Sequence, residues 1–304
     1  MNEMKTGPFP GDAMERIAAE YQGRMGFYVE DLNSGAVHQY NAEQRFPTAS
    51  VIKIAVLVEL FRQVEEGKLS LDERRRLEGD IAMHGSGTLS LMVDGPELSL
   101  KDYCRMMITI SDNSATDFLM GVVGLASINA TLDELGYANI RASMTMGQYH
   151  FAMAHMEHLP CTPENEKLFA ERMASGAKDY NSVSFSDSLK NNVAAPGELA
   201  DLLKRLQGGE IVSETASIGM IEILKLCKDR RMIKRDLDAA VEIAHKSGSS
   251  GRIKGNAGIV FLPTGPLVIA AFALASSDEV NGGDAIADVS RLAIAALSPD
   301  SIAQ

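Results

Sequence analysis

The stretch "FPTASVIKIAVLVEL", residues 46–60, contains a serine three positions ahead of a lysine, followed by an almost unbroken apolar run. Serine favours helix N-termini, and a helix that is apolar nearly all round is a buried one. We therefore predict a buried helix with Ser50 at or near its N-terminus. Because side chains at i and i+3 share a helix face, Lys53 should lie on the same side as Ser50.

A lysine in such a run has two explanations. Burial disfavours the charged amine and lowers the lysine pKa, so that a neutral Lys53 could take the proton of the Ser50 hydroxyl. Unpaired N–H groups at the helix N-terminus could then receive a developing oxyanion. Alternatively, Ser50 only caps the helix, and Lys53 extends its amine to solvent.

Composition narrows the function classes. The chain has 304 residues, of which 45% are hydrophobic, and this supplies enough apolar surface for one large core or two smaller ones. Its net charge is -12 and its sequence pI is about 5.0. An acidic chain gains nothing from phosphate backbones, so nucleic acid is not an expected partner. We find no apolar stretch long enough for a membrane span and no leader pattern, which predicts either a cytoplasmic chain or one whose leader was removed.

The cysteines and histidines predict neither disulfides nor a metal site. The three cysteines, Cys104, Cys161 and Cys227, are far apart and odd in number. His155 and His158 are close together, but two histidines at i, i+3 are weak grounds for a metal. No cofactor is expected, and the oligomeric state is left open.

The pattern of elements predicts an α+β fold. Residues 10–22 are typical of a helix that Asp12 could cap, and residues 24–43 of a β-hairpin turning at 33–35. Residues 241–276 contain three further strands, and 282–298 a final helix. We expect one antiparallel sheet flanked by the first and last helices, with a mainly helical segment between the strand groups.

This arrangement predicts two domains. Residues 1–47 and 238–304 would form the α/β domain, and residues 48–237 an inserted helical domain. Small-molecule sites tend to lie where domains meet, so a cleft is expected there.

Two further motifs follow the first one along the chain. Ser111, Asp112 and Asn113 form an S-D-N triplet, and Lys246, Ser247 and Gly248 form a K-S-G triplet followed by Ser249. Alone, the first could be an Asx turn or helix cap and the second a strand ending in a turn. The ordered set S-x-x-K, S-D-N, K-S-G is much more specific.

The chain thereby resembles the class A β-lactamases and penicillin-binding proteins, from about residue 20 to 298. "NNVAAPGELADLLKRL" also resembles the passage from that family's Ω-loop into the next helix. The resemblance implies a β-lactamase-like fold and a serine hydrolase that forms an acyl-enzyme.

The resemblance also implies a role for each motif residue. Ser50 is the nucleophile and Lys53 its base, while Ser111 and Lys246 pass a proton to the leaving nitrogen. Asn113, Ser247 and Gly248 would bind the substrate, and the N–H groups of Ser50 and Ser249 would form the oxyanion hole. Asp112 is expected to point away and fix its loop.

One region departs from the family pattern. The interval from Ser111 to Lys246 is longer than the family norm, and the excess falls at about residues 140–190, where the family keeps its Ω-loop and deacylating glutamate. No convincing copy of that glutamate is found; the acidic residues in the region are Glu157, Glu164, Glu166, Glu171 and Asp179. "ENEKLFAERM" is more typical of a surface helix with its glutamates outward and Leu168, Phe169 and Met173 inward.

Two smaller departures concern single positions. Cys104 occupies the place of a disulfide half in some relatives, but its partner position is Leu57, so Cys104 is expected to be a small buried hydrophobe. The strand position where an arginine often holds the substrate carboxylate is Ala257. Arg252 or Lys254 could substitute.

We therefore expect a β-lactamase-like serine hydrolase acting on a small β-lactam or related acyl substrate. Without a deacylation base, a penicillin-binding-like D-alanyl-D-alanine carboxypeptidase or an esterase with slow deacylation is the alternative. A third hypothesis is a sensor or binding domain without turnover, which would have no need of both lysines.

Overall fold

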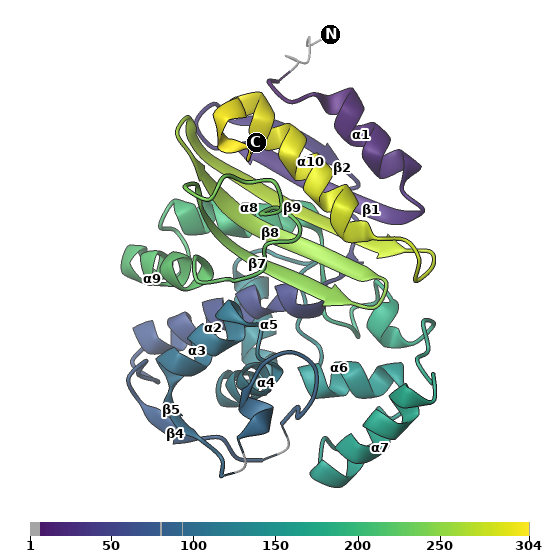
Figure 1. The fold of residues 1–304 in the computed structure, drawn as a ribbon. Helices are drawn as coiled ribbons and strands as arrows, with labels where there is room; N and C mark the ends of the chain where they lie inside the picture. The colour runs from purple at the N-terminus through teal and green to yellow at the C-terminus, as the bar shows by residue number, and fades with distance from the viewer. Residues whose placement is uncertain (1–6, 80, 93, 304) are drawn as a thin grey trace.

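The computed structural model describes residues 7–79, 81–92 and 94–303 and shows a sheet beside a group of helices (Figure 1). Residues 1–6 of the predicted α/β domain lie outside the described residues. The sheet has five antiparallel strands in the order β2-β1-β9-β8-β7. Their bounds are Gly23–Asp31 for β1, Ala36–Tyr40 for β2, Glu242–Ser250 for β7, Ile253–Leu262 for β8 and Gly265–Ala275 for β9.

Two helices cover one face of this sheet, namely α1 (Gly11–Glu20) and α10 (Gly282–Leu297). The predicted hairpin, the three late strands and the covering helices are thus confirmed. The predicted cap on α1 is wrong: Pro10 holds the N-cap position, no side chain caps the helix, and Asp12 lies within its first turn.

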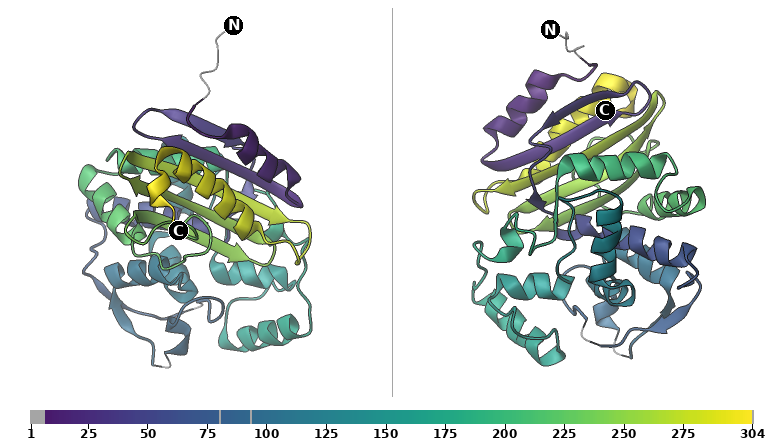
Figure 2. Two further views of the ribbon diagram at one scale, coloured as in Figure 1. Left: turned by 45° about the horizontal axis from the view of Figure 1, so that its top comes forward. Right: turned by 180° about the vertical axis from the view of Figure 1, so that it is seen from behind.

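The opposite face carries α8 (Pro196–Gln207), which packs on β1, β8 and β9, as the view from behind in Figure 2 shows. The central strand β9 explains how one sheet serves two cores. Val268, Ala270 and Phe272 enter the core on the α8 side, whereas Ile269 and Ala271 enter the core under α1 and α10. This alternation follows from the two-residue period of a strand.

The remaining helices form a separate group below the sheet. They are α2 (Lys53–Glu65), α3 (Leu100–Thr109), α4 (Asn113–Val123), α5 (Leu125–Glu134), α6 (Met146–Met153), α7 (Pro163–Ala174) and α9 (Glu214–Leu224). Short pairs of strands brace this group: β3 (Phe46–Pro47) with β6 (Val193–Ala194), and β4 (Arg74–Arg76) with β5 (Glu97–Ser99).

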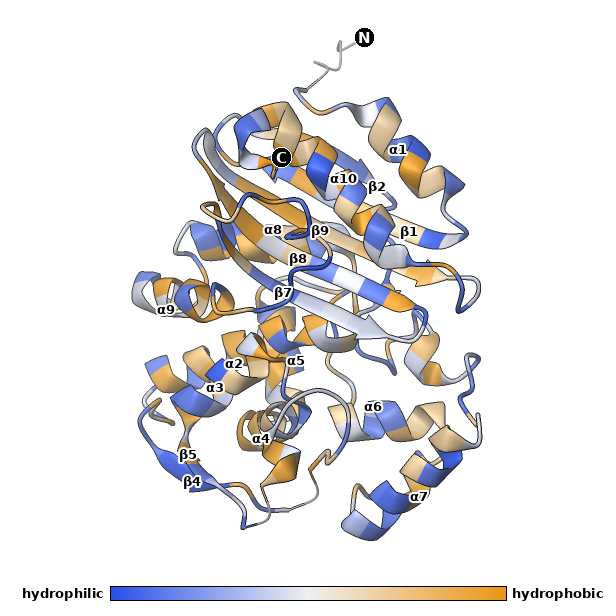
Figure 3. Cartoon of the chain, viewed as in Figure 1, coloured by the Kyte–Doolittle hydropathy of each residue, from blue (hydrophilic) through white to orange (hydrophobic). Residues whose placement is uncertain are grey.

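Helix α2 lies at the centre of this group, where hydrophobic residues predominate (Figure 3). Every residue from Lys53 to Phe61 is buried. Each fully buried leucine, such as Leu57 or Leu60, contributes about 1.5–3 kcal/mol to stability. The prediction of a buried helix is therefore confirmed.

No single helix in the described part of the chain has the length and apolar character to cross a bilayer. Helices α4 and α5 pass that test only as a pair, and they meet at an angle of 73°.

Candidate active site

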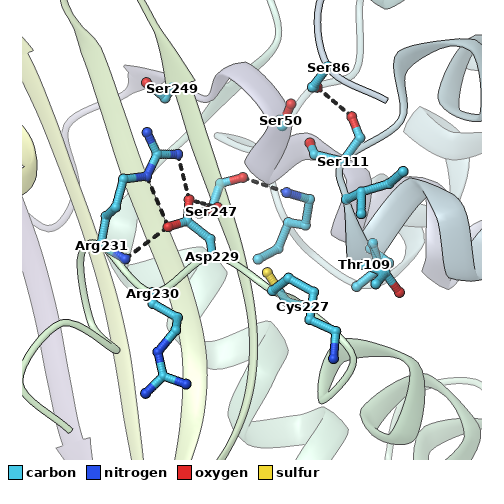
Figure 4. Close-up of a pocket in the computed structure, with 14 residues that line it drawn as sticks. Ser50, Ser86, Thr109, Ser111, Cys227, Asp229, Arg230, Arg231, Ser247 and Ser249 are labelled. Carbon is cyan, nitrogen blue, oxygen red and sulfur yellow. Dashed lines mark hydrogen bonds and ion pairs between the residues drawn. The ribbon is translucent and has the colours of Figure 1, made fainter. Parts of the chain in front are cut away.

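A cavity of about 370 Å³ lies between the edge strand β7 and the helical group (Figure 4). The three sequence motifs meet there, although they are far apart in the chain. The predicted residues that line the cavity are Ser50, Ser111, Lys246, Ser247 and Ser249. Lys53, Asn113 and Gly248 lie just behind its wall, so all eight predicted residues belong to one neighbourhood.

Ser50 lies in a single 3₁₀ turn, Ala49–Ile52, that leads directly into α2. The turn begins with Ala49 at a φ of 44°, a left-handed conformation that is unfavourable for a residue with a side chain. Neither the turn nor α2 is capped by a side chain, and Ser50 Oγ makes no hydrogen bond to any described residue. The capping explanation for Ser50 therefore fails, and its hydroxyl faces the cavity.

Lys53 is the first residue of α2 and is 0% exposed, which excludes the explanation that its amine reaches solvent. Its Nζ lies 2.7 Å from Ser111 O, 2.9 Å from Ser111 Oγ and 3.0 Å from Asn113 Oδ1. Burial, aided by the Lys246 charge, lowers the pKa of Lys53 well below its ordinary value. A neutral Lys53 amine would donate hydrogen bonds to Ser111 O and Asn113 Oδ1, and its lone pair would accept a hydrogen bond from the Ser111 hydroxyl.

The backbone of Ser111 is also strained, with a φ of 59°. Its carbonyl accepts from Lys53 Nζ and, at 2.6 Å, from Ser86 Oγ. Ser86 also lines the cavity. It lies in HGSGTLSL, residues 84–91, a stretch that resembles the family, but the sequence analysis assigned it no role. These two donors hold the Ser111 hydroxyl between Lys53 and the open cavity.

Asp112 and Asn113 fix the loop around Ser111. Asp112 is the N-cap of α4, and its second carboxylate oxygen accepts from the backbone N–H groups of Thr88 and Leu89. This agrees with the expectation that Asp112 points away from the site. Asn113 is buried, and its amide already engages Lys53 and, at 3.3 Å, the His84 carbonyl.

On the opposite wall, Lys246 is 1% exposed and donates to the Ser247 carbonyl at 2.6 Å. The pKa of Lys246 lies below its ordinary value, because burial outweighs the opposing effects of the nearby Cys227 and Asp229. The Ser247 hydroxyl donates to Asp229 Oδ2 at 2.7 Å, and Asp229 is paired with Arg231 at 2.7 Å. Figure 4 shows this Ser247–Asp229–Arg231 chain along the strand.

Glycine at position 248 has a steric reason. A Cβ there would lie 2.4 Å from Thr48 O and 3.0 Å from Ser50 N. The strand therefore approaches the Ser50 turn more closely than any residue with a side chain allows. This contact sets the distance between the Ser50 turn and the wall that carries Lys246.

The cationic side chains that line the cavity differ from those expected. They are Lys228, Arg230, Arg231 and Lys246. Arg252 instead stacks on Tyr180 and pairs with Asp278, while Lys254 donates to Ser249 Oγ at 2.7 Å. Ala257 is buried within β8. The loop after α9 thus supplies arginines that the strand does not, and no local pattern in the sequence indicated it.

Segment 140–190 brings no glutamate to the cavity. Among the described residues that line it, Asp229 is the only carboxylate. Glu157, Glu164 and Glu171 are exposed, and Asp179 pairs with His155. The prediction of a helix with Phe169 inward is confirmed by α7, but the outward placement of Glu166 is wrong. Glu166 is buried, and its carboxylate accepts from the His84 ring.

The segment instead meets the site through Asp117 on α4. The carboxylate of Asp117 accepts the Met146 and Gly147 N–H groups at the start of α6, at 2.5 and 2.8 Å. Burial raises the pKa of Asp117 to about 6, although these bonds and the Lys53 charge oppose the shift. Cys104, as expected, is a buried core residue and forms no disulfide.

Comparison with known proteins adds an independent finding. A family described as the beta-lactamase enzyme family matches residues 10–297. Beta-lactamase L2 of Stenotrophomonas maltophilia is 31% identical over 138 residues, 42% of this chain and 45% of that protein. Beta-lactamase PSE-4 of Pseudomonas aeruginosa is 28% identical over 111 residues, 36% of this chain and 38% of that protein. The chain thus spans less than half the length of these curated relatives.

Solved structures are similar over much more of the chain. A beta-lactamase from Sphaerobacter thermophilus has a TM-score of 0.74 at 26% identity, over 95% of this chain and 96% of that one. An acyl-enzyme complex of a PBP-A mutant with penicillin G has a TM-score of 0.74 at 26% identity, over 92% of both chains.

Proposed function

The chain belongs to the beta-lactamase enzyme family, and from this premise we propose that it opens the cyclic amide of a β-lactam through a Ser50 acyl-enzyme. One observation supports this most strongly. The Ser50 hydroxyl faces the same cavity as Ser111 and Lys246, and the buried Lys53 amine lies 2.9 Å from Ser111 Oγ. This arrangement provides a nucleophile, a base and a path for the proton.

The proposed reaction begins when Ser50 Oγ attacks the lactam carbonyl and its proton passes to neutral Lys53. The backbone N–H groups of Ser50 and Ser249 would stabilise the oxyanion. Lys53 then returns the proton through Ser111 Oγ to the leaving nitrogen, assisted by the positive charge of Lys246. The arginines of the loop after α9 would attract the substrate carboxylate, with Arg231 the nearer to Ser249 in Figure 4, although it already pairs with Asp229.

Release of the acyl group is the weak step in this proposal. Deacylation needs a water held by a base, and Asp229, the one lining carboxylate among the described residues, is occupied by Ser247 and Arg231. Its pKa is also held low: burial would raise it, but the hydrogen bonds from Arg231 and Ser247 outweigh burial. Slow deacylation favours the second candidate, a penicillin-binding-like carboxypeptidase or an esterase.

The test is mass spectrometry of the chain after mixing with a penicillin. We expect one adduct, located on Ser50 and absent in Ser50→Ala; no adduct with several β-lactams would refute the proposal. Parallel assays of nitrocefin and p-nitrophenyl ester hydrolysis separate the two candidates. A persistent adduct without nitrocefin turnover supports the carboxypeptidase or esterase.

A further inference from the structure

A second cavity, of about 440 Å³, adjoins the cavity that contains Ser50, and the proposed hydrolysis does not use its space. The two cavities share a wall, because Arg230 and Arg231 line both of them. We call the second cavity the cationic pocket. Its lining includes Arg230, Arg231, Arg235 and Lys254, together with Gly283 and Asp284 from the first turn of α10.

Two of the four cations in the cationic pocket are neutralised by the chain itself. Arg231 is paired with Asp229 at 2.7 Å. Arg235 is paired with three carboxylates, which belong to Asp236, Asp284 and Asp288. These two arginines are therefore held in place and supply little free positive charge.

The other two cations have no carboxylate partner. Arg230 makes no hydrogen bond or ion pair with any described residue, and Figure 4 shows its guanidinium pointing away from Ser50. Lys254 donates to Ser249 Oγ at 2.7 Å and to the Gly251 carbonyl at 3.3 Å, and it forms no ion pair within the described part of the chain. Because the chain as a whole carries a net charge of -12, two unpaired cations in one cavity are a local reversal of its charge.

Lys254 connects the two cavities. Its amine holds the hydroxyl of Ser249, which lines the first cavity. Its stem is half-buried against the start of α10, since a Cβ on Gly282 would lie 3.4 Å from Lys254 Cγ. Burial and the charge of Arg231 lower the pKa of Lys254, and a bound anion would offset both effects.

We propose that the cationic pocket binds a second anionic group, a carboxylate or a phosphate, of the acyl substrate that Ser50 attacks. The first carboxylate of that substrate would lie at the shared wall near Arg231, and the second group would lie between Arg230 and Lys254. This inference rests on the proposed function, which places the first carboxylate. A free inorganic anion offers the same chemistry, and the experiment separates the two sources.

The first arm compares two cephalosporins that share the acyl side chain and the ring carboxylate. They differ at the neighbouring ring position, where one carries a carboxyethyl group and the other a propyl group. We expect Ser50 acylation to be about fivefold more efficient with the dianionic compound, the scale of partly exposed charge pairs. The preference should shrink as NaCl is raised to about 0.5 M. Equal efficiencies at low salt would overturn the proposal.

Variants locate the effect. Arg230→Gln and Lys254→Gln should each lower the preference for the dianionic compound at least about twofold. Lys190→Gln is the matched control, because it removes the same charge from an exposed lysine that lines neither cavity. The readout is the ratio of the two cephalosporins, in which a general loss of acylation cancels. Arg230 is exposed, so its variant decides if Lys254→Gln does not fold; an unchanged ratio in Arg230→Gln would refute the assignment.

The second arm titrates the whole chain with inorganic phosphate by calorimetry, without any β-lactam. We expect phosphate to bind, and Arg230→Gln to weaken that binding more than Lys190→Gln does. Phosphate binding without any preference for the dianionic cephalosporin would assign the pocket to a free anion and overturn the substrate assignment. Failure of both arms, with penicillin still labelling Ser50, counts against this inference alone. If no β-lactam labels Ser50, the proposed function fails, and the phosphate titration still decides whether the pocket binds anions.

Discussion

The two sides of the cavity differ in how their residues are built into the chain. The groups proposed for acylation come from three short motifs on rigid elements: the turn before α2, the loop before α4, and the edge strand β7. Segment 140–190 instead contributes α6 and α7, which bury methionines and aromatic rings near Ala49 and His84 and place no glutamate at the cavity. Under the proposed function, acylation and release would therefore depend on different parts of the sequence.

The largest effect should come from Lys53→Ala. Loss of the base should reduce the Ser50 acylation rate about 10²–10⁴-fold, the range for general base catalysis. The variant also removes the buried amine that donates to Asn113 Oδ1 and to the Ser111 carbonyl oxygen. Single-turnover mass spectrometry measures the rate. Lys68→Ala, at an exposed lysine in the turn after α2, is the control and should change little; a similar loss there would refute a specific role for Lys53.

Gly248→Ala tests the close approach of β7 to the nucleophile turn. The added Cβ would press on Thr48 O and Ser50 N and displace the turn, so we expect acylation to slow about 10²-fold, as for misplacement by about 1 Å. The control is Gly121→Ala, which meets nothing within 4 Å on the exposed face of α4. That variant should gain about 0.5–1 kcal/mol in unfolding free energy and keep its rate. An unaffected acylation rate in Gly248→Ala would show that the close approach of β7 does not position the Ser50 turn.

Glu166→Gln examines the other region. It removes the buried, charged acceptor of the half-buried His84 ring, and we expect the unfolding free energy to fall by about 1–3 kcal/mol. The rates of acylation and of adduct loss should stay within about threefold, an order-of-magnitude allowance for small indirect shifts. Glu164→Gln, which is exposed, serves as the control in denaturant melts. Tenfold slower adduct loss in Glu166→Gln would show that Glu166 takes part in deacylation, and it would refute the statement that segment 140–190 supplies no carboxylate for this step.

The smallest predicted effect is a pH dependence of stability from Asp117. Its pKa is about 6 in the folded chain, against 3.8 ordinarily, so between these values the folded state binds more protons than the unfolded one. Its contribution to stability is therefore largest below about pH 4 and falls by roughly 1–3 kcal/mol as the pH rises to 6. Comparing denaturant melts of Asp117→Asn and the unaltered chain isolates this contribution; equal slopes in this window would contradict it.

The sequence predicted the parts of the molecule that local pattern encodes. Alternation and turn residues located the strands, and the spacing of Ser50 and Lys53 located the buried helix start. The cap at Asp12 and the outward Glu166 failed because each depended on a neighbour that only the fold supplies: Pro10 at the helix start, and His84, which is distant in the chain.

The same limit applies to the residues that were missed. Contacts with residues distant in the chain place Ser86 beside Ser111 and Asp229 beside Ser247, and Asp229 in turn holds Arg231. No regular spacing in the sequence predicts these contacts. The motifs therefore predicted the residues that line the site, but not the residues that hold them in position.

The central claim is that Lys53 is uncharged at neutral pH. NMR titration of its ε-carbon, assigned by comparison with Lys53→Ala, measures this directly. We expect a midpoint well below the ordinary lysine value of 10.5, together with an acylation rate that rises with pH through the same midpoint. A Lys53 that stays protonated up to about 10.5 would contradict it.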